Sequence, residues 1–141
     1  MDRVVIGLDV GEKRIGVAIG DTDTKIARPS NPIRNDETIV PNIEKLISEC
    51  ETTTIIVGLP RNMDGSETDQ SKYIRKFADD ISKKINVQII FQDESLTSVI
   101  AEQNLRMRKD FSELMLRDGT LDSAAAALIL SDYLENNGGE G

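Results

Sequence analysis

Hydrophobic and polar positions predict a run of strands at the start of the chain. Val4–Val10 is apolar on both faces, which is typical of a central buried strand. After a short polar turn, Arg14–Gly20 predicts a second strand that returns antiparallel to the first. Lys25–Arg28 predicts the opening of a third strand, which Pro29 and Pro32 confine to a short or edge position. The chain therefore begins as a β-meander.

After the meander, apolar residues recur at helical spacing, and these stretches alternate with β-branched runs. The predicted elements are a helix over Ile39–Cys50 capped by Thr38, a strand over Thr52–Leu59, a helix ending at Ile85 with a Ser66–Asp69 capping box near its start, a strand over Val87–Gln92, a helix over Ser98–Leu105, a mobile loop over Arg106–Gly119, and a last helix from Thr120 or Leu121 to Leu134. Strands joined by helices run parallel, so the order βββαβαβαα predicts an α/β fold. Its mixed five-stranded sheet, with helices on both faces, is typical of the ribonuclease-H-like class.

The length of 141 residues suits one domain, which we place at residues 1–135, followed by a flexible tail at 136–141. No apolar stretch approaches the roughly 18–20 residues that a membrane-spanning helix needs. The N-terminal run has the pattern of a strand and lacks the charged start of a signal peptide. We therefore expect a cytoplasmic protein with no membrane contact.

The amino-acid composition excludes several kinds of catalytic mechanism and metal site. The chain has no histidine, which excludes Ser-His-Asp hydrolysis, Cys-His proteolysis and histidine-ligated zinc. The single cysteine, Cys50, excludes an internal disulfide and a multi-thiolate zinc site. The 25 acidic and 17 basic residues give a net charge of −8. That charge argues against indiscriminate coating of nucleic acid, although it allows a local basic rim around cation-binding carboxylates.

Asp9 is the sharpest chemical signal. It lies near the carboxyl end of an otherwise apolar strand, where ligands of open α/β sheets bind and where an unpartnered carboxylate is costly to bury. A plainer interpretation is that Asp9 caps the turn at Gly11. Capping alone does not explain why Gly7, Gly11, Gly16 and Gly20 crowd two adjacent strands, since strand glycines often mark the close approach of another backbone or a ligand.

Two further acidic positions are candidate partners of Asp9. Asp93 and Glu94 end the fifth predicted strand, and period-two alternation sends them to opposite faces without deciding which one meets Asp9. Asp122 lies in the first turn of the last helix, where a helix-dipole role is the alternative. The run Ala124–Ala127 allows this helix to pack closely on the sheet, which would bring Asp122 toward Asp9.

Three carboxylates at one end of a sheet repel one another unless a cation lies between them. Oxygen ligands suit Mg²⁺ or Mn²⁺, and one or two such ions can activate water for phosphodiester cleavage without histidine. The residues therefore favour a metal-dependent nuclease.

Four motifs in order resemble the YqgF-type Holliday-junction-resolvase-like family, which is also described as a family of candidate nucleases for the 5′ end of pre-16S rRNA. The motifs are Gly7-Leu8-Asp9-Val10-Gly11 with Lys13-Arg14-Ile15-Gly16-Val17-Ala18, then Val57-Gly58-Leu59-Pro60 with Asn62-Met63-Asp64-Gly65-Ser66, then Asp93-Glu94 with Leu96-Thr97-Ser98, and finally Asp122 with Ala124-Ala125. Together they cover nearly the whole chain. The resemblance implies a ribonuclease-H-like fold and a hydrolase that acts in rRNA processing and ribosome biogenesis.

The resemblance also implies that Asp9, Glu94 and Asp122 are the catalytic residues and hold Mg²⁺ or Mn²⁺, which favours Glu94 over Asp93. Candidate phosphate contacts are Lys13, Arg14, Arg61, Arg106, Arg108 and Arg117. Two features depart from the family pattern. Ser95 stands where the family usually has Arg after the Asp-Glu pair, and the loop before the last helix is less basic than usual. We expect these departures to affect substrate binding more than metal chemistry.

Other functions compete with this one. A sugar-kinase or actin-type ATPase also uses an Asp-x-Gly after its first strand, but it needs two such domains and this chain has length for one. A non-catalytic RNA- or protein-binding module of the same fold is a second alternative. As substrate we favour structured precursor RNA over branched DNA. Because symmetric cutting of a DNA junction usually requires a C₂ dimer, we expect a monomer or weak homodimer.

Overall fold

The computed structural model describes residues 3–60, 64–94 and 97–137. Its elements are β1 (Val4–Val10), β2 (Arg14–Asp21), β3 (Ile26–Arg34), α1 (Ile39–Cys50), β4 (Thr54–Pro60), α2 (Asp69–Lys84), β5 (Gln88–Glu94), α3 (Thr97–Arg106), the short 3₁₀ helix η1 (Glu113–Leu116) and α4 (Thr120–Asn137). This is the predicted order, with one additional 3₁₀ turn before the last helix. Within the part of the chain that the structure describes, no helix is long and apolar enough to span a membrane.

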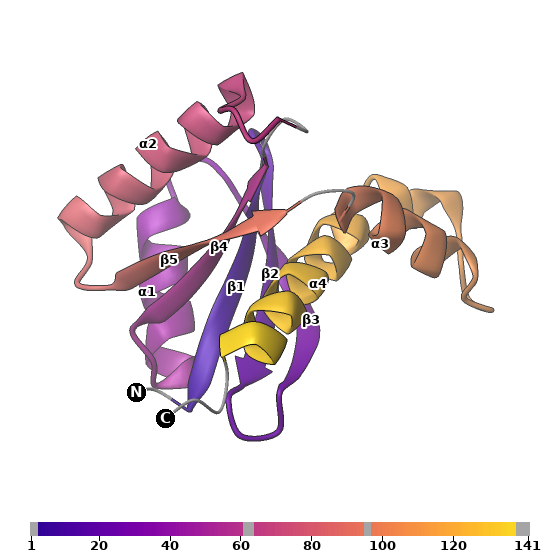
Figure 1. Ribbon diagram of the computed structural model, residues 1–141, viewed down its shortest axis with the longest axis horizontal. Helices are drawn as coiled ribbons and strands as arrows, with labels where there is room; N and C mark the ends of the chain where they lie inside the picture. The colour runs from indigo at the N-terminus through magenta and orange to yellow at the C-terminus, as the bar shows by residue number, and fades with distance from the viewer. Residues whose placement is uncertain (1–2, 61–63, 95–96, 138–141) are drawn as a thin grey trace.

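The strands form one mixed sheet in the order β3-β2-β1-β4-β5 (Figure 1). The strands of the meander, β1, β2 and β3, pair antiparallel, whereas β4 pairs parallel to β1 and β5 parallel to β4. The helices that connect the parallel strands account for this direction, because a chain that crosses back over the sheet re-enters it in the same sense. The predicted mixed five-stranded sheet is confirmed.

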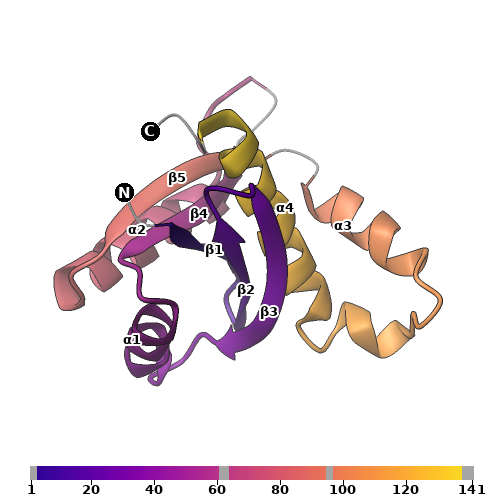
Figure 2. The same cartoon turned by 90° about the horizontal axis from the view of Figure 1, so that it is seen from below.

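Helices cover both faces of the sheet: α1 and α2 lie on one face and α4 crosses the other (Figure 2). Alternation along β1 divides its side chains between the two cores. Ile6, Leu8 and Val10 pack with residues of α1 and α2, while Val5 packs with residues of α4. The same alternation puts Asp9 on the α4 face.

Glycines on the sheet allow α4 to approach closely. A Cβ atom at Gly7 would lie 2.9 Å from the Leu130 Cβ, and one at Gly20 would lie 2.8 Å from the Leu130 Cδ2. A Cβ atom at Gly16 would overlap the backbone carbonyl of Asp122. The strand glycines at positions 7, 16 and 20 therefore make room for a helix rather than for a ligand. The close packing predicted from the alanine run is confirmed, since Ala126 is fully buried.

A hydrogen bond also joins the first turn of α4 to the sheet. The pairing of β2 with β3 shifts register between Ile15 and Val17. The backbone N–H of Val17 donates to the Ser123 Oγ at 3.1 Å. Because Ser123 follows Asp122 directly, this bond and the contact at Gly16 hold the start of α4 in place.

Strand β3 is longer than the sequence predicts, because it continues through Pro29 and Pro32 to Arg34. Both prolines are tolerated because β3 is an edge strand, where a missing N–H need not break a ladder on both sides. Of the two predicted options, a short strand or an edge strand, the structure shows the edge strand.

One predicted helix cap is wrong by two residues, and the other is confirmed in position. The capping box of α2 is formed by Thr68 and Ser71, rather than by Ser66 and Asp69. Thr38 is the N-cap residue of α1, as predicted, although its side chain accepts no hydrogen bond from a backbone N–H of that helix. The Thr38 N–H donates to Asp36 Oδ1 at 2.9 Å. Ser, Thr and Asp all cap well, so a sequence with several of them in a row does not indicate which one does so.

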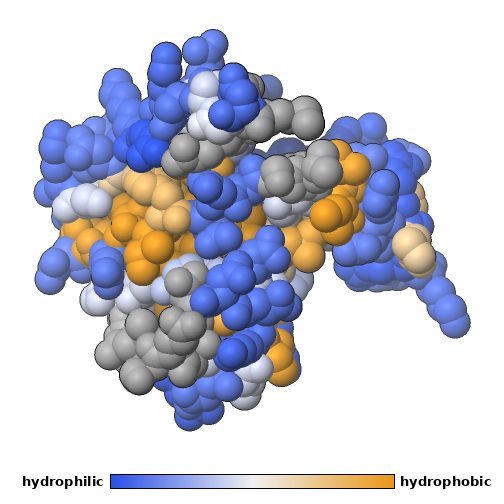
Figure 3. All heavy atoms as spheres, in the orientation of Figure 1, coloured by the Kyte–Doolittle hydropathy of each residue, from blue (hydrophilic) through white to orange (hydrophobic). Residues whose placement is uncertain are grey.

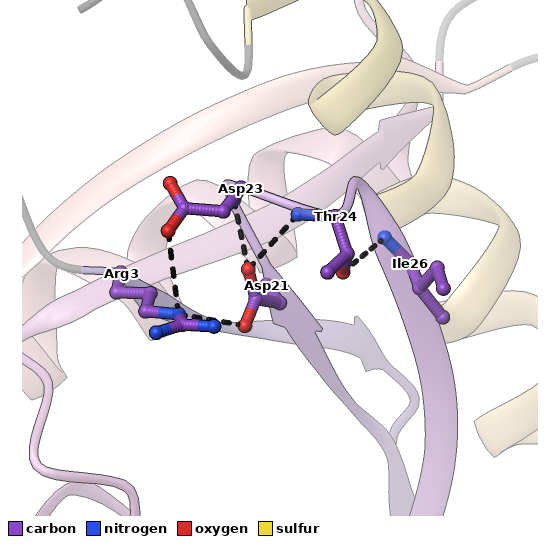
Figure 4. Close-up of polar contacts among 5 residues, drawn as sticks. All are labelled: Arg3, Asp21, Asp23, Thr24 and Ile26. Carbon is purple, nitrogen blue, oxygen red and sulfur yellow. Dashed lines mark hydrogen bonds and ion pairs between the residues drawn. The ribbon is translucent and has the colours of Figure 1, made fainter.

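The turn between β2 and β3 closes the end of the sheet opposite Asp9 (Figure 4). Asp21 Oδ1 accepts hydrogen bonds from the backbone N–H groups of Asp23 at 2.8 Å and Thr24 at 3.1 Å. Arg3 Nε donates to Asp21 Oδ2 at 3.0 Å and lies 3.5 Å from Asp23 Oδ2. These exposed charges stabilise a turn and take no part in the site at the other end.

The segment from α3 to η1 lies beside α4 and away from the sheet (Figures 1 and 2). The predicted mobile loop over Arg106–Gly119 contains η1 and hydrogen-bonded turns. Helix α4 continues to Asn137, so the first two residues of the predicted tail are helical, and positions 138–141 lie outside the described residues. Figure 3 shows hydrophobic side chains along the edge strand β5, whose residues are less deeply buried than those of β4.

Candidate functional site

Asp9 is the centre of the candidate site. It lies opposite Gly16 of β2, on the α4 face and one residue from the end of β1. Burial, together with the negative charges of Glu94 and Asp122, raises the pKa of Asp9 to about 7. Such a carboxylate takes up a proton near neutral pH unless a positive charge approaches it. The electrostatic effect also shows that the three predicted carboxylates lie near one another.

Glu94 reaches the same face from the end of β5. Val87, Ile89 and Phe91 pack in the core of α1 and α2, and Ile90 packs against the α4 core. Alternation therefore turns Glu94 toward Asp9, whereas Asp93 is exposed. This placement agrees with the choice of Glu94 that the family resemblance implies.

The Glu94 side chain lies in space that Gly58 leaves open. A Cβ at Gly58 would overlap the Glu94 Oε2. That oxygen is buried and has no hydrogen-bond partner among the described residues. Burial raises the pKa of Glu94 as well. An orphaned buried carboxylate oxygen is costly, so this position favours a proton or a cation beside it.

Asp122 completes the group from the first turn of α4. Its Oδ2 lies 3.5 Å from the Arg14 Nε, and both side chains are about two-fifths exposed. An ion pair with this much exposure contributes little to stability. Arg14 instead fixes where the Asp122 carboxylate points, since it is the partner that the structure gives this side chain.

The donor set fits a hard divalent cation in its chemistry. All three side chains offer carboxylate oxygens, which Mg²⁺ and Mn²⁺ prefer, and one of those oxygens has no other partner among the residues that the structure describes. Within residues 3–60, 64–94 and 97–137, however, no three acidic or cysteine side chains are gathered tightly enough to hold one ion as they stand. For Asp9, Glu94 and Asp122 to share one ion, their side chains must rotate, and the Asp122 carboxylate must move away from Arg14.

A groove of about 610 Å³ lies beside Asp122 at the end of the sheet. Its lining includes the cations Lys13, Arg14 and Arg34 together with Glu12, Asp36 and Asp118. Two of the six predicted phosphate contacts, Lys13 and Arg14, therefore line this groove, and Arg14 also contacts Asp122. Sequence reasoning missed Arg34, although hairpin register could have indicated it, because Arg34 pairs with Arg14 across β2 and β3.

The other predicted basic contacts are not gathered at this groove. Arg106 pairs with Glu102 at 3.2 Å and lies over the Phe111 ring, and Arg108 pairs with Asp110 at 2.6 Å. Arg117 is exposed just after η1. These three belong to the segment beside α4, and two of them are engaged in local ion pairs. Arg61 lies outside the described residues.

Known proteins resemble this chain in sequence and in fold. The model of the RuvX family, described as "Holliday junction resolvase", matches residues 3–136. A protein of Shewanella denitrificans named "Putative pre-16S rRNA nuclease" is 40% identical over 139 residues, which cover 96% of each chain. A protein of the same name from Chloroflexus aurantiacus is 39% identical over 140 residues, covering 95% of this chain and 88% of the relative.

Two solved structures share the fold at low sequence identity. The T. thermophilus RuvC in complex with a Holliday junction substrate superposes with a TM-score of 0.55 at 13% identity, covering 95% of this chain and 96% of that one. The Fowlpox virus resolvase with junction DNA superposes with a TM-score of 0.54 at 14% identity, covering 94% and 97%. The predicted ribonuclease-H-like fold class is confirmed.

Proposed function

The chain belongs to the RuvX family, and from that premise we propose that it is a divalent-metal-dependent nuclease that processes the 5′ end of pre-16S rRNA in the cytoplasm. The relatives named for that RNA match nearly the full length of the chain, which supports this substrate. The observation that carries the proposal is the convergence of Asp9, Glu94 and Asp122 on one face of the sheet.

These three carboxylates would hold Mg²⁺ or Mn²⁺. A bound divalent ion supplies a nucleophilic water at neutral pH and stabilises the charge on the leaving oxygen. Asp9 releases the proton that its burial favours, and its carboxylate then balances the positive charge. Glu94 gains a partner for its orphaned oxygen.

The chain's own cations orient the substrate in this proposal. Arg14 lies between the carboxylates and the groove, 3.5 Å from Asp122, so it is placed to contact a phosphate once Asp122 turns away. Lys13 lies next to it at the turn and lines the same groove. Both contacts act on the phosphate backbone and read no base, which is consistent with recognition by RNA structure.

The test is a cleavage assay with two substrates, a precursor RNA that contains the 5′ end of 16S rRNA and a four-way DNA junction. We expect cutting of the RNA with Mg²⁺ or Mn²⁺ and no cutting with a chelator. Junction DNA is the second candidate, because solved neighbours of the same fold bind it. Paired symmetric cuts in the junction by a stable dimer, with the RNA left intact, would contradict the RNA assignment.

Metal binding should depend on pH through Asp9. Because its pKa is about 7 in the folded chain, Asp9 is largely protonated at pH 6 and must lose a proton before it can bind an ion. Mn²⁺ affinity should therefore rise about tenfold per pH unit below pH 7 and level off above it. Calorimetry in two buffers of different ionisation enthalpy would measure the released proton. An affinity that is constant from pH 6 to 8 would show that no ligand loses a proton in this range and would contradict the raised pKa of Asp9.

A further inference from the structure

Asn35 lies where two grooves adjoin. It lines the groove of about 610 Å³ that also contains Lys13, Arg14 and Arg34. It also lines a second groove, of about 300 Å³, between α1 and α2, to which Tyr73 and Lys76 contribute. The two grooves therefore adjoin at Asn35 and lead from Arg14, the partner of Asp122, to α2. Helix α2 starts above the end of β1 (Figure 1).

Hydrogen bonds join this surface into one unit. Asn35 Nδ2 donates to the Gly11 carbonyl at 2.8 Å and to the Tyr73 hydroxyl at 2.9 Å. The Asn35 backbone N–H donates to the Lys13 carbonyl at 2.9 Å. Asn35 therefore fixes the turn that carries Lys13 and Arg14 relative to the Tyr73 ring.

The Tyr73 ring is held in place yet remains accessible. Tyr73 is 39% exposed, and it is one of the large apolar residues that lie at the surface of the described part of the chain. Asn35 holds its hydroxyl in place, and the ring of a half-buried tyrosine at a groove is a surface on which a flat aromatic group can stack. Ile39, Val40 and Phe77 line the same groove and give it an apolar floor.

Charge along the surface is balanced rather than strongly positive. Lys13 and Lys76 form no ion pair within the part of the chain that the structure describes, and Arg34 lies beside Asp36. Asp36 and Asp118 accept hydrogen bonds from the backbone N–H groups of Thr38 and Thr120, but their charges remain. Because phosphate attraction alone is modest here, a ligand gains most if it also offers an aromatic face.

We propose that these two grooves bind an unpaired stretch of RNA that adjoins the scissile phosphate, with one base stacked on Tyr73 and neighbouring phosphates at Lys13, Arg34 and Lys76. An unpaired strand suits the site better than a duplex, since a duplex hides its base faces within its own stack. The inference rests on the proposed nuclease function and makes it specific: the substrate is RNA with a single-stranded segment beside the cut.

The experiment measures binding by the full-length chain carrying Asp9→Asn, so that cleavage does not interfere. Fluorescence anisotropy would compare an RNA hairpin with the same hairpin bearing a short unpaired extension. We expect the extension to tighten binding about fivefold or more, the range for one stacked base. Tyr73→Ala should remove that gain. Tyr73→Phe keeps the ring and loses only the hydroxyl, so it should retain it.

Two further variants sharpen the comparison. Arg34→Gln should weaken binding of the extended RNA and reduce the slope of log affinity against log salt by about 0.7, the contribution of one phosphate contact on a single strand. Ile26→Ala removes an exposed apolar side chain at the far end of β3, 52% exposed, and should leave both affinities as they are.

Four results would overturn the inference. Equal gain from the extension in Tyr73→Ala and in its parent would exclude stacking on this ring. Equal loss in Tyr73→Phe and Tyr73→Ala would assign the effect to the Asn35 hydrogen bond rather than to stacking. Failure of the parent chain to bind either RNA would contradict the proposed function itself, and this inference with it, whereas binding of both hairpins alike contradicts only the inference.

Discussion

Asp9→Asn is expected to abolish divalent-dependent cleavage while it makes the metal-free chain more stable at pH 8. Asn keeps the size of the side chain but loses the charge that would attract the ion. Metal activation of water is worth several kcal/mol in the transition state, so the rate should fall about a thousandfold or more. Initial rates on the precursor RNA at saturating Mg²⁺ would measure this loss.

The gain in stability follows from the direction of the pKa shift. The pKa of Asp9 rises from 3.8 to about 7 on folding, so the folded state holds a proton that the unfolded state releases between these values. Stability contributed by the protonated form is complete below pH 3.8 and is lost as pH rises through 7. Asn cannot ionise, so with a chelator present the variant should be more stable at pH 8 by on the order of 2 kcal/mol.

Asp93→Asn is the matched control, because Asp93 is an exposed acid at the end of β5 that faces away from Asp9. It should leave the cleavage rate unchanged. Undiminished cleavage by Asp9→Asn would eliminate Asp9 from the chemistry and favour the alternative of a binding module with the same fold. Urea unfolding at pH 5 and pH 8 would measure the stability difference for both variants.

Gly16→Ala should be the most damaging small substitution in the sheet. The added methyl group would overlap the backbone carbonyl of Asp122 and come within 2.7 Å of the Ser123 nitrogen. Backbone atoms cannot rotate away, so α4 must shift from β2. We expect a loss of about 3 kcal/mol or more, and a fall in melting temperature of ~10 °C. Because Asp122 moves with the helix, cleavage by the folded fraction should fall too.

Gly65→Ala is the comparison for Gly16→Ala. Gly65 has a φ of 85°, but a Cβ there meets nothing within 4 Å. The cost is then only that of the left-handed backbone, about 1 kcal/mol. Thermal unfolding followed by circular dichroism would rank the two variants. A smaller loss at Gly16 than at Gly65 would show that α4 does not press on β2 as the structure indicates.

The order of strands and helices could be predicted from the sequence, and so could the acidic residues that are candidates for the site. Alternation in β1 and β5 follows from backbone geometry, so it separates Asp93 from Glu94, but the choice of Glu94 as the partner of Asp9 came from the family resemblance. The alanine run in α4 predicted close packing, and the glycines opposite it provide the matching space. Both inferences rest on patterns repeated over several residues, which makes them robust.

Features that depend on a single contact could not be predicted. Ser66 and Thr68 are both good caps, and only the path of the loop decides that Thr68 is used. The link from Asn35 to Tyr73 joins residues 38 positions apart with no shared motif. The pairing of Arg108 with Asp110 likewise depends on a local turn, which a list of basic residues does not show.

The docking of α4 orders events during synthesis of the chain. Asp9 lies on β1, which is synthesised well before α4, the helix that carries Asp122. The face of the sheet at Gly7, Gly16 and Gly20 stays uncovered until α4 packs on it. Domains are made from the N-terminus at about 5–20 residues per second, so several seconds separate the two carboxylates. A nascent or truncated chain therefore lacks a complete acidic cluster. Nuclease activity would begin only once α4 has docked, and chains interrupted before α4 would pose no threat to the RNA around them.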